Sequence, residues 1–317
     1  MIFCFRKVLY NGSMDIKTLL KDYLDYLEIE KNRSVKTRVN YERYLKRFLD
    51  FAKISKPEQI SQDLVRQYRL WLNRQPARPL DNARGKPAGL KKNTQNYYLI
   101  ALRNLLKYAA KRDVKILPAD KIELGKQSER QVIFLENNEL ERLLNAPDNL
   151  RDRAILELLF STGLRVSELC ALNRDSINFK SGEFAVRGKG DKVRLVFLSD
   201  TAKTAMKNYL EKRGDIDPAL FIRGGKNPAK ENNLRLTSRS IERMVKHYSA
   251  KAGLSKKITP HSLRHSFATD LLMNGADIRS VQELLGHSSI ITTQIYTHIT
   301  NKQLREVHQA FHSKRRK

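Results

Sequence analysis

Cysteine is the residue type that this chain most nearly lacks, with two among 317 residues, Cys4 and Cys170. Two cysteines so far apart form neither a metal-ligand motif nor a disulfide framework, and we expect no disulfide between them. Cys170 lies in an apolar stretch with helical spacing, where a free cysteine behaves as a small apolar residue. We therefore expect Cys170 to be a core residue.

Long apolar runs are also missing. No stretch reaches 18 apolar residues, which excludes a transmembrane helix. The apolar start, residues 1–5, is too short for a signal peptide and has no small-residue cleavage site. Met14 could be a second start, which would leave residues 1–13 as a disordered extension. We expect a soluble, cytoplasmic protein without a membrane partner.

Acidic residues are scarce relative to basic ones. There are 34 Asp and Glu against 61 Lys and Arg, so the net charge is +27. Residues 14–112 hold 23 basic and 10 acidic residues, and residues 134–317 hold 32 and 20, so the excess is not confined to a tail. A charge this large predicts a polyanionic partner, nucleic acid, contacted by two basic regions. The alternative is a solvated basic surface without such a partner.

The first domain is expected over residues 14–112 and should be helical. Apolar residues recur at helical spacing in three segments, and a fourth helix is expected to follow Thr94 as its N-cap. Residues 75–92 are rich in proline, glycine and arginine and predict a loop. The aromatic residues of these helices are expected mainly in the core rather than as platforms for stacked bases. The three segments with helical spacing are residues 16–27, 41–52 and 60–71.

The second domain is expected over residues 134–312, after a linker at 113–133 that shows no clear periodicity. It should begin with two helices, continue through a small three-stranded antiparallel sheet and return to helices, with a disordered basic tail at 313–317. The predicted fold class is therefore mainly α with two domains, a four-helix domain and a mixed α+β domain. The predicted helices lie near 137–146 and 151–161, the strands at 176–180, 183–187 and 193–198, and a loop at 223–236.

Three short segments of the second domain gather residues suited to chemistry on a phosphodiester. Two arginines can neutralise its non-bridging oxygens, two histidines can handle protons, and a tyrosine can attack phosphorus. Each residue alone has a structural interpretation, such as a surface arginine or a half-buried tyrosine, but the conjunction favours a site. The segments are Thr162-Gly-Leu-Arg165-Val-Ser-Glu168, His261-Ser-Leu-Arg264-His265-Ser-Phe-Ala-Thr269 and Leu284-Leu-Gly-His287, followed by Tyr296-Thr-His298.

Glycines and a proline predict how these segments are placed. Gly163 should end a helix and leave Arg165 at a turn, and Gly286 should end another helix just before His287. Pro260 should open a helix whose first turn presents His261 and Arg264 on one face, near N–H groups that favour phosphate. Glu168, one turn after Arg165, could orient a catalytic side chain or cap a helix. His265 is expected to be structural.

A tyrosine with a pKa near 10 is a poor nucleophile unless positive charge or a base assists it. The arginines and histidines supply that environment for Tyr296. The leaving 5′ oxygen also needs a proton, and a lysine on a hairpin turn can swing in to donate it. Lys189, which lies between two glycines, fits this role, and Lys192 is the alternative.

The motifs resemble those of the tyrosine recombinases, the phage-integrase family, and most closely the Xer-type recombinases, over about residues 14–312. The resemblance places the family's paired arginines on Arg165 and Arg264 and its nucleophile on Tyr296. Glu168 matches the acidic position that accompanies the first arginine. The catalytic histidines match His261 and His287, and the hairpin lysine matches Lys189.

The resemblance implies an enzyme that clamps double-stranded DNA between a core-binding domain and a catalytic domain. It implies a 3′-phosphotyrosine link, then strand exchange through a four-way Holliday junction between two sites held by four protomers, without metal or cofactor. Resolution of chromosome or plasmid dimers, which serves chromosome partition and cell division, is the expected role. A second recombinase or a DNA translocase could be a partner. Residues 301–311 could form a final helix that docks on a neighbouring protomer.

Three alternatives remain beside this one. An integrase of a mobile element would use the same chemistry, a DNA-binding architectural protein would no longer cut, and a type IB topoisomerase would relax DNA rather than recombine it. The full set of catalytic residue types argues against the architectural protein, and the compact layout argues against the topoisomerase.

Overall fold

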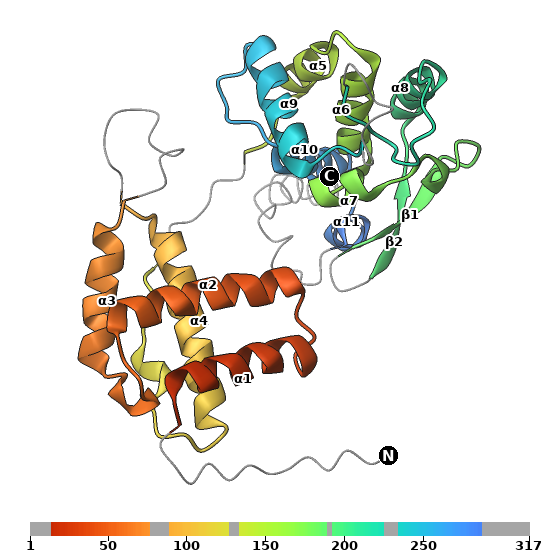
Figure 1. The fold of residues 1–317 in the computed structure, drawn as a ribbon. Coiled ribbons are helices and arrows are strands. Elements are labelled where there is room, and N and C mark those ends of the chain that lie inside the picture. Colours follow the sequence, from red (N-terminus) through yellow and green to blue (C-terminus); the bar gives the residue numbers. More distant parts are fainter. Residues whose placement is uncertain (1–13, 77–88, 127–132, 189–191, 225–233, 287–317) are drawn as a thin grey trace, which may run out of the picture. The chain divides into compact units, whose positions relative to one another are not determined.

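A computed structural model describes residues 14–76, 89–126, 133–188, 192–224 and 234–286. Contacts divide the chain into two compact units, residues 1–129 and 130–317 (Figure 1). The predictions for residues 1–13, for the interior of the first loop and for the segment from 287 to the C-terminus lie outside the described residues.

The first unit is a four-helix domain, as the spacing of apolar residues predicts. Its helices begin at polar N-caps where the sequence supplies them, Asp15, Ser34 and Ser61, whose side chains accept backbone N–H groups. The fourth helix begins at Lys92 rather than after Thr94, because the Thr94 N–H already bonds to the Lys91 carbonyl. The expected Thr94 cap is therefore wrong. The helices are α1 (Ile16–Ile29), α2 (Val35–Ala52), α3 (Gln62–Arg74) and α4 (Lys92–Ala110), with a 3₁₀ turn η1 (Pro57–Gln59).

The core of this unit is rich in aromatic rings, as predicted. Tyr23, Phe48 and Tyr68 are almost fully buried, and the Phe48 and Tyr68 rings meet edge to face with centroids 5.0 Å apart. Tyr97 is the exception, with half of its surface exposed. Residues 114–122, which fall within the predicted linker, also pack on this core through Ile122 and its apolar neighbours. They include a short 3₁₀ turn, η3 (Ala119–Lys121).

The second unit is built around helix α6 (Leu150–Thr162), whose apolar residues are buried almost all round. Helix α8 (Asp200–Glu211) packs along one side of α6, and α10 (Pro260–Met273) packs along another (Figure 1). The two helices predicted near 137–146 and 151–161 are confirmed. The remaining helices are α5 (Asn137–Asn145), α7 (Val166–Ala171), α9 (Ser238–Lys251) and α11 (Ile278–Leu285), with a 3₁₀ turn η4 (Arg174–Ser176).

The described antiparallel sheet has two strands, β1 (Glu183–Arg187) and β2 (Val193–Phe197), with Ala185 opposite Leu195. The predicted third strand at 176–180 is absent from this part of the chain. Asn178 explains the difference, because its side chain accepts the N–H groups of Lys180 and Ser181 and turns the chain. A single bridge between Asn178 and Glu183 is all that joins this segment to β1.

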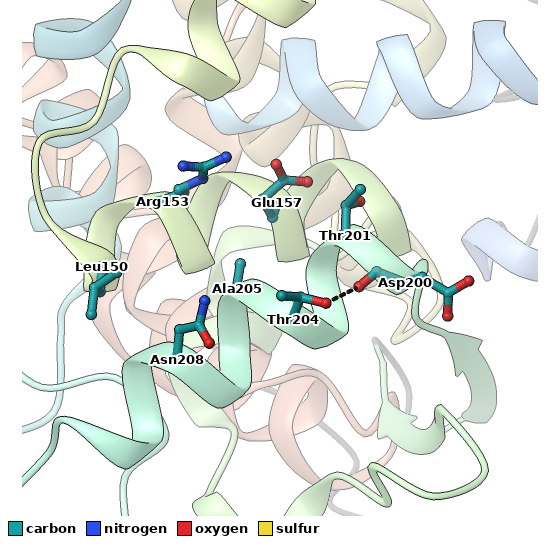
Figure 2. A pocket seen from close by; sticks show the side chains of 8 residues that line it. All are labelled: Leu150, Arg153, Glu157, Asp200, Thr201, Thr204, Ala205 and Asn208. Atoms are coloured by element: carbon teal, nitrogen blue, oxygen red, sulfur yellow. Dashed lines mark hydrogen bonds between the residues drawn. The ribbon is translucent and has the colours of Figure 1, made fainter.

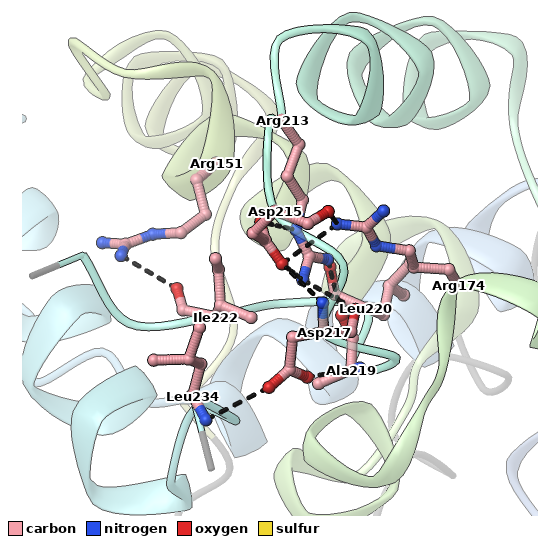
Figure 3. Close-up of polar contacts among 9 residues, drawn as sticks. All are labelled: Arg151, Arg174, Arg213, Asp215, Asp217, Ala219, Leu220, Ile222 and Leu234. Carbon is pink, nitrogen blue, oxygen red and sulfur yellow. Dashed lines mark hydrogen bonds and ion pairs between the residues drawn. The ribbon is translucent and has the colours of Figure 1, made fainter. Parts of the chain in front are cut away.

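An ion-pair network fixes the loop that follows α8 (Figure 3). The Arg213 guanidinium donates to both oxygens of Asp215, at 2.6 and 2.7 Å, and also to the carbonyls of Asp217, Ala219 and Leu220. Its side chain is 2% exposed. The bonds of Arg213 tie this loop to itself, and Arg174 of η4 also donates to the Asp215 carbonyl and carboxylate, so the network orders the chain just after α8.

A shallow groove lies between α6 and α8 and contains a buried carboxyl group, Glu157 (Figure 2). Burial raises the pKa of Glu157, and a hydrogen bond with Thr201 opposes that rise. Beside it, the Thr204 hydroxyl donates to the Asp200 carbonyl within α8. Most residues that line the groove are polar or charged, and Leu150 and Ala205 are its apolar residues. Across the described residues, no helix is both long enough and apolar enough to span a bilayer.

Candidate active site

Two helices of the second unit end at glycines, and both ends belong to the site. Gly163 ends α6 with φ +57°, and Gly286 ends α11 with φ +61°, as predicted. A Cβ at Gly163 would lie 2.4 Å from the Phe267 ring. At this position glycine therefore serves both the left-handed backbone and the close packing of α10.

The first turn of α10 presents the predicted pair His261 and Arg264. The helix begins at Pro260, and Thr259 and Ser262 cap each other in a capping box. His261 is exposed, whereas Arg264 is 5% exposed. The Arg264 guanidinium donates to the carbonyls of Gly163 and Leu285. One arginine therefore holds the ends of both glycine-terminated helices.

Three guanidinium groups converge on the C-terminal end of α11. Arg194 Nε donates to the Leu284 carbonyl at 3.0 Å, and Arg165 Nη2 donates to the Gly286 carbonyl at 3.2 Å. Arg264 binds the Leu285 carbonyl between them. The last carbonyls of a helix lack partners within the helix and carry the negative end of its dipole, so cations stabilise them. Arg165 and Arg264 therefore bind neighbouring carbonyls of the chain.

Glu168 joins two of these arginines. Its carboxylate accepts from Arg165 Nη1 at 2.7 Å and from the Arg165 backbone N–H at 2.8 Å. The same carboxylate accepts from Arg194 Nη1 at 3.1 Å and Nη2 at 2.8 Å. Of the two roles expected of Glu168, the capping role is confirmed, because Glu168 closes a capping box at the start of α7. Its carboxylate also binds the Arg165 side chain.

The hydrogen-bond partners of Glu168 keep its carboxylate ionised. Burial raises the pKa of Glu168, but the hydrogen bonds from Arg194 and Arg165 outweigh burial and lower the pKa to about 2. Glu168 is thus an anion at any physiological pH. Arg165 keeps 27% of its side chain exposed, so it retains surface toward solvent while its carboxylate partner is buried.

His265 is half-buried one turn after His261. Burial lowers the pKa of His265 to about 4, and the charges of His261 and Arg264 act in the same direction. A neutral, inward residue fits the structural role expected for it. His261, one turn earlier and exposed, is placed as a residue that can meet a ligand.

Three predicted site residues lie outside the described residues, namely Lys189, His287 and Tyr296. Their described chain neighbours lie at the site. Gly188 precedes the hairpin turn, and a Cβ on it would lie 3.5 Å from Glu168 Oε1. Gly286, which precedes His287, is bound by Arg165. The described residues include no group of His, Cys, Asp or Glu that could hold a metal ion.

Arg194 is the site residue that sequence reasoning missed. The apolar spacing of the segment Val193-Arg-Leu-Val-Phe197 predicts only that it forms a strand. The signal was present, because a lone arginine within an apolar strand either faces solvent or has a buried anionic partner. Deciding between the two needed the register of β2, which places Arg194 and Val196 inward and leaves Val193 and Leu195 exposed.

The arrangement can bind a phosphodiester and stabilise negative charge on it. Arg165 and Arg264 bind neighbouring carbonyls at the end of one helix, and an exposed histidine stands at a helix N-terminus. Glu168, the anionic partner of Arg165, is buried.

Comparisons with known proteins agree with this chemistry. The model named Phage integrase family matches residues 133–303, and the model of the phage integrase N-terminal SAM-like domain matches residues 20–113. The chain belongs to the phage integrase family. Tyrosine recombinase XerD of Staphylococcus saprophyticus is 39% identical over 305 residues, which cover 93% of this chain and 98% of that protein. Tyrosine recombinase XerC of Thermodesulfovibrio yellowstonii is 36% identical, with 92% and 95% covered.

These relatives show that the chain is a tyrosine recombinase of the Xer type, an enzyme of site-specific recombination. Among solved structures, XerH recombinase bound to palindromic difH substrate in a post-cleavage complex matches 91% of this chain and 82% of that one. Its TM-score is 0.65 at 24% identity, which shows a shared fold. The predicted fold class, mainly helical with a four-helix domain and a mixed second domain, is confirmed.

The pKa of His265 predicts how stability depends on pH. The unfolded chain binds a proton at this histidine near pH 6.5, whereas the fold holds it neutral to about pH 4. Stability is therefore full above pH 6.5 and is lost as the pH falls toward 4. We expect the free energy of unfolding to fall by about 2 kcal/mol from this group between pH 7 and 5. Urea unfolding at several pH values would measure it.

His265→Gln should flatten this slope, because it removes the titrating group. His247→Gln, which changes an exposed histidine on α9, is the matched control and should keep the wild-type slope. Equal slopes for wild type and His265→Gln would contradict the assignment.

Proposed function

We propose that this recombinase cleaves and rejoins double-stranded DNA through a 3′-phosphotyrosine intermediate formed by Tyr296. The observation that carries the proposal is the convergence of Arg165 and Arg264 on adjacent carbonyls at the end of α11, one residue before His287. Solved relatives support DNA as the partner, since the XerH structures hold difH substrate and a lambda integrase dimer is bound to a core site. In this proposal residues 14–112 form the core-binding domain and residues 134–312 the catalytic domain.

Each residue then has one task in the reaction. Arg165 and Arg264 neutralise the non-bridging oxygens of the scissile phosphate, and their charge stabilises the pentacoordinate transition state. The Tyr296 oxygen bonds to phosphorus while the bond to the 5′ oxygen breaks, and Lys189 gives that oxygen its proton. His261 and His287 assist proton transfer from the tyrosine. Glu168 keeps the Arg165 side chain in place.

The covalent link conserves the energy of the phosphodiester, so the freed 5′ hydroxyl of a partner duplex can attack it and no cofactor is needed. Four protomers on two sites would carry out two such exchanges through a Holliday junction. The reaction would resolve chromosome or plasmid dimers, and integration of a mobile element is the alternative role. A second recombinase or a DNA translocase would control which protomers cut.

Tyr296→Phe tests the chemistry, because it removes the nucleophilic oxygen and little else. The variant should bind target DNA like wild type but form no covalent complex. Both proteins are incubated without metal and with nicked suicide duplexes from the host's replication-terminus region, and the products are run on denaturing gels. A shifted band for wild type alone is the expected result. A covalent band with the variant would remove Tyr296 from its role.

A wild-type protein that binds tightly and never forms the band would instead favour the alternative of a DNA-binding architectural protein.

Deletion of residues 301–317 tests the assembly. If this segment docks on a neighbouring protomer, the truncated protein should lose complexes on paired sites at concentrations where it still binds one site. Gel mobility with one-site and two-site duplexes separates the two steps. An equal loss in both assays would show that the segment serves binding or folding rather than assembly.

A further inference from the structure

Arg194 is the less exposed of the two arginines that share the Glu168 carboxylate. Its side chain is 9% exposed, against 27% for Arg165, and the carboxylate between them is 5% exposed. Guanidinium and carboxylate groups are rarely buried without partners, because taking a charge out of water is costly. Here the geometry compensates for that cost, since two nitrogens of Arg194 meet the two oxygens of Glu168 at 3.1 and 2.8 Å.

The third nitrogen of Arg194 has a separate partner. Nε donates to the Leu284 carbonyl, 90 residues away in the sequence. The one guanidinium therefore joins strand β2, the start of α7 and the end of α11. A lysine could not reproduce this pattern, because an ammonium group is a point charge without the planar fork of arginine.

The backbone at Gly286 leaves room for this side chain. A Cβ at Gly286 would lie 2.9 Å from Arg194 Cδ and 3.4 Å from its Nη1. Gly286 thus combines the left-handed conformation that ends α11 with the close passage of Arg194. Glycine at this position therefore lets β2 approach the end of α11, and the two elements pack together.

Arg194 also lies on the strand that leaves the hairpin turn. The Gly188 N–H bonds to the Lys192 carbonyl, which closes the turn two residues before Arg194. The turn that follows Gly188 carries Lys189, and the helix end that Arg194 binds precedes His287. Arg194 thereby ties the chain that follows Lys189 and the chain that precedes His287 to the carboxylate that binds Arg165.

We propose that Arg194 is a positioning residue for DNA cleavage, which fixes Arg165 through Glu168 and holds the end of α11 in register with the β1–β2 hairpin. It does not touch the phosphate. This assignment rests on the proposed function, and it assigns Arg194 an effect on the rate of the chemical step rather than on DNA affinity. Most affinity for DNA comes from many phosphate contacts spread over the protein.

The competing explanation is a buried ion pair that only stabilises the fold. The protein offers a matched control in the second unit, because Arg213 is 2% exposed and pairs with both oxygens of Asp215 far along the chain from the site residues. Arg213→Lys makes the same change of side chain in an ion pair that orders a loop. A purely structural role would make the two variants behave alike.

The experiment compares wild type, Arg194→Lys and Arg213→Lys on a nicked duplex that carries the target site. Three quantities are measured well below the melting temperature: the Kd for the duplex, the single-turnover rate of covalent complex formation, and Tm. We expect Arg194→Lys to lose about 100-fold in rate, the cost of a misplacement near 1 Å, with Kd within about threefold of wild type. Arg213→Lys should have a lower Tm than wild type, with an unchanged rate of covalent complex formation and an unchanged Kd.

A cleavage rate for Arg194→Lys within about threefold of wild type would overturn the assignment, as would a rate loss matched by an equal loss of affinity. The assignment would also be overturned if Arg213→Lys lost cleavage rate to the same extent while its Kd for the duplex stayed unchanged. A wild-type protein that forms no covalent complex would defeat the proposed function, and this assignment with it, so the two failures are distinguishable.

A second variant keeps the test independent of the folding of Arg194→Lys. Arg194→Ala leaves a space beside Glu168 that a free guanidinium can enter. We expect millimolar ethylguanidinium to restore part of the cleavage rate of Arg194→Ala, and ethylammonium at the same concentration to restore none. Equal effects of the two salts, or no rescue of a folded variant, would count against a positioning role.

Discussion

The carboxylate of Glu168 is the group on which the rest of the site depends. It is buried, and it remains an anion because Arg165 and Arg194 both donate to it. Removing either arginine side chain would leave the buried carboxylate with one cationic partner. The resulting loss of stability is far larger than for a surface ion pair. The same two arginines continue past the carboxylate to the carbonyls that end α11. One anion and one helix end therefore hold two cations in place.

The glycine ends of α6 and α11 make this arrangement feasible. Both glycines have positive φ, and a side chain on either would collide with a neighbour, Phe267 at Gly163 and Arg194 at Gly286. Arg264 binds carbonyls at both ends. Because helix ends expose unpaired carbonyls, these carbonyls can bind guanidinium groups, and no further acidic residues are needed there. A chain with a net charge of +27 thereby positions arginines for an anionic ligand while few carboxylates compete with that ligand.

Much of this organisation could be predicted from the sequence because it depends on local signals. Gly163, Pro260 and Gly286 end or begin helices by their own backbone preferences, so the turn at Arg165 and the first turn of α10 were predicted correctly. The predicted strand at 176–180 is absent because of one side chain, Asn178, which accepts the N–H groups of Lys180 and Ser181. The contacts of Arg194 could not be predicted, because they join it to residues 26 and 90 positions away, and apolar spacing carries no information about such pairing. The placement of Lys189, His287 and Tyr296 remains a prediction from the motifs.

The most direct test of the account is to identify the residue that becomes joined to DNA. Wild-type protein trapped on a suicide duplex in the presence of EDTA would be digested with trypsin and nuclease, and the modified peptide would be sequenced by mass spectrometry. We predict a nucleotide linked through its 3′ phosphate to Tyr296. The same adduct on any of the other tyrosines, or on a serine or histidine, would contradict the proposed chemistry and the site built around Arg165 and Arg264.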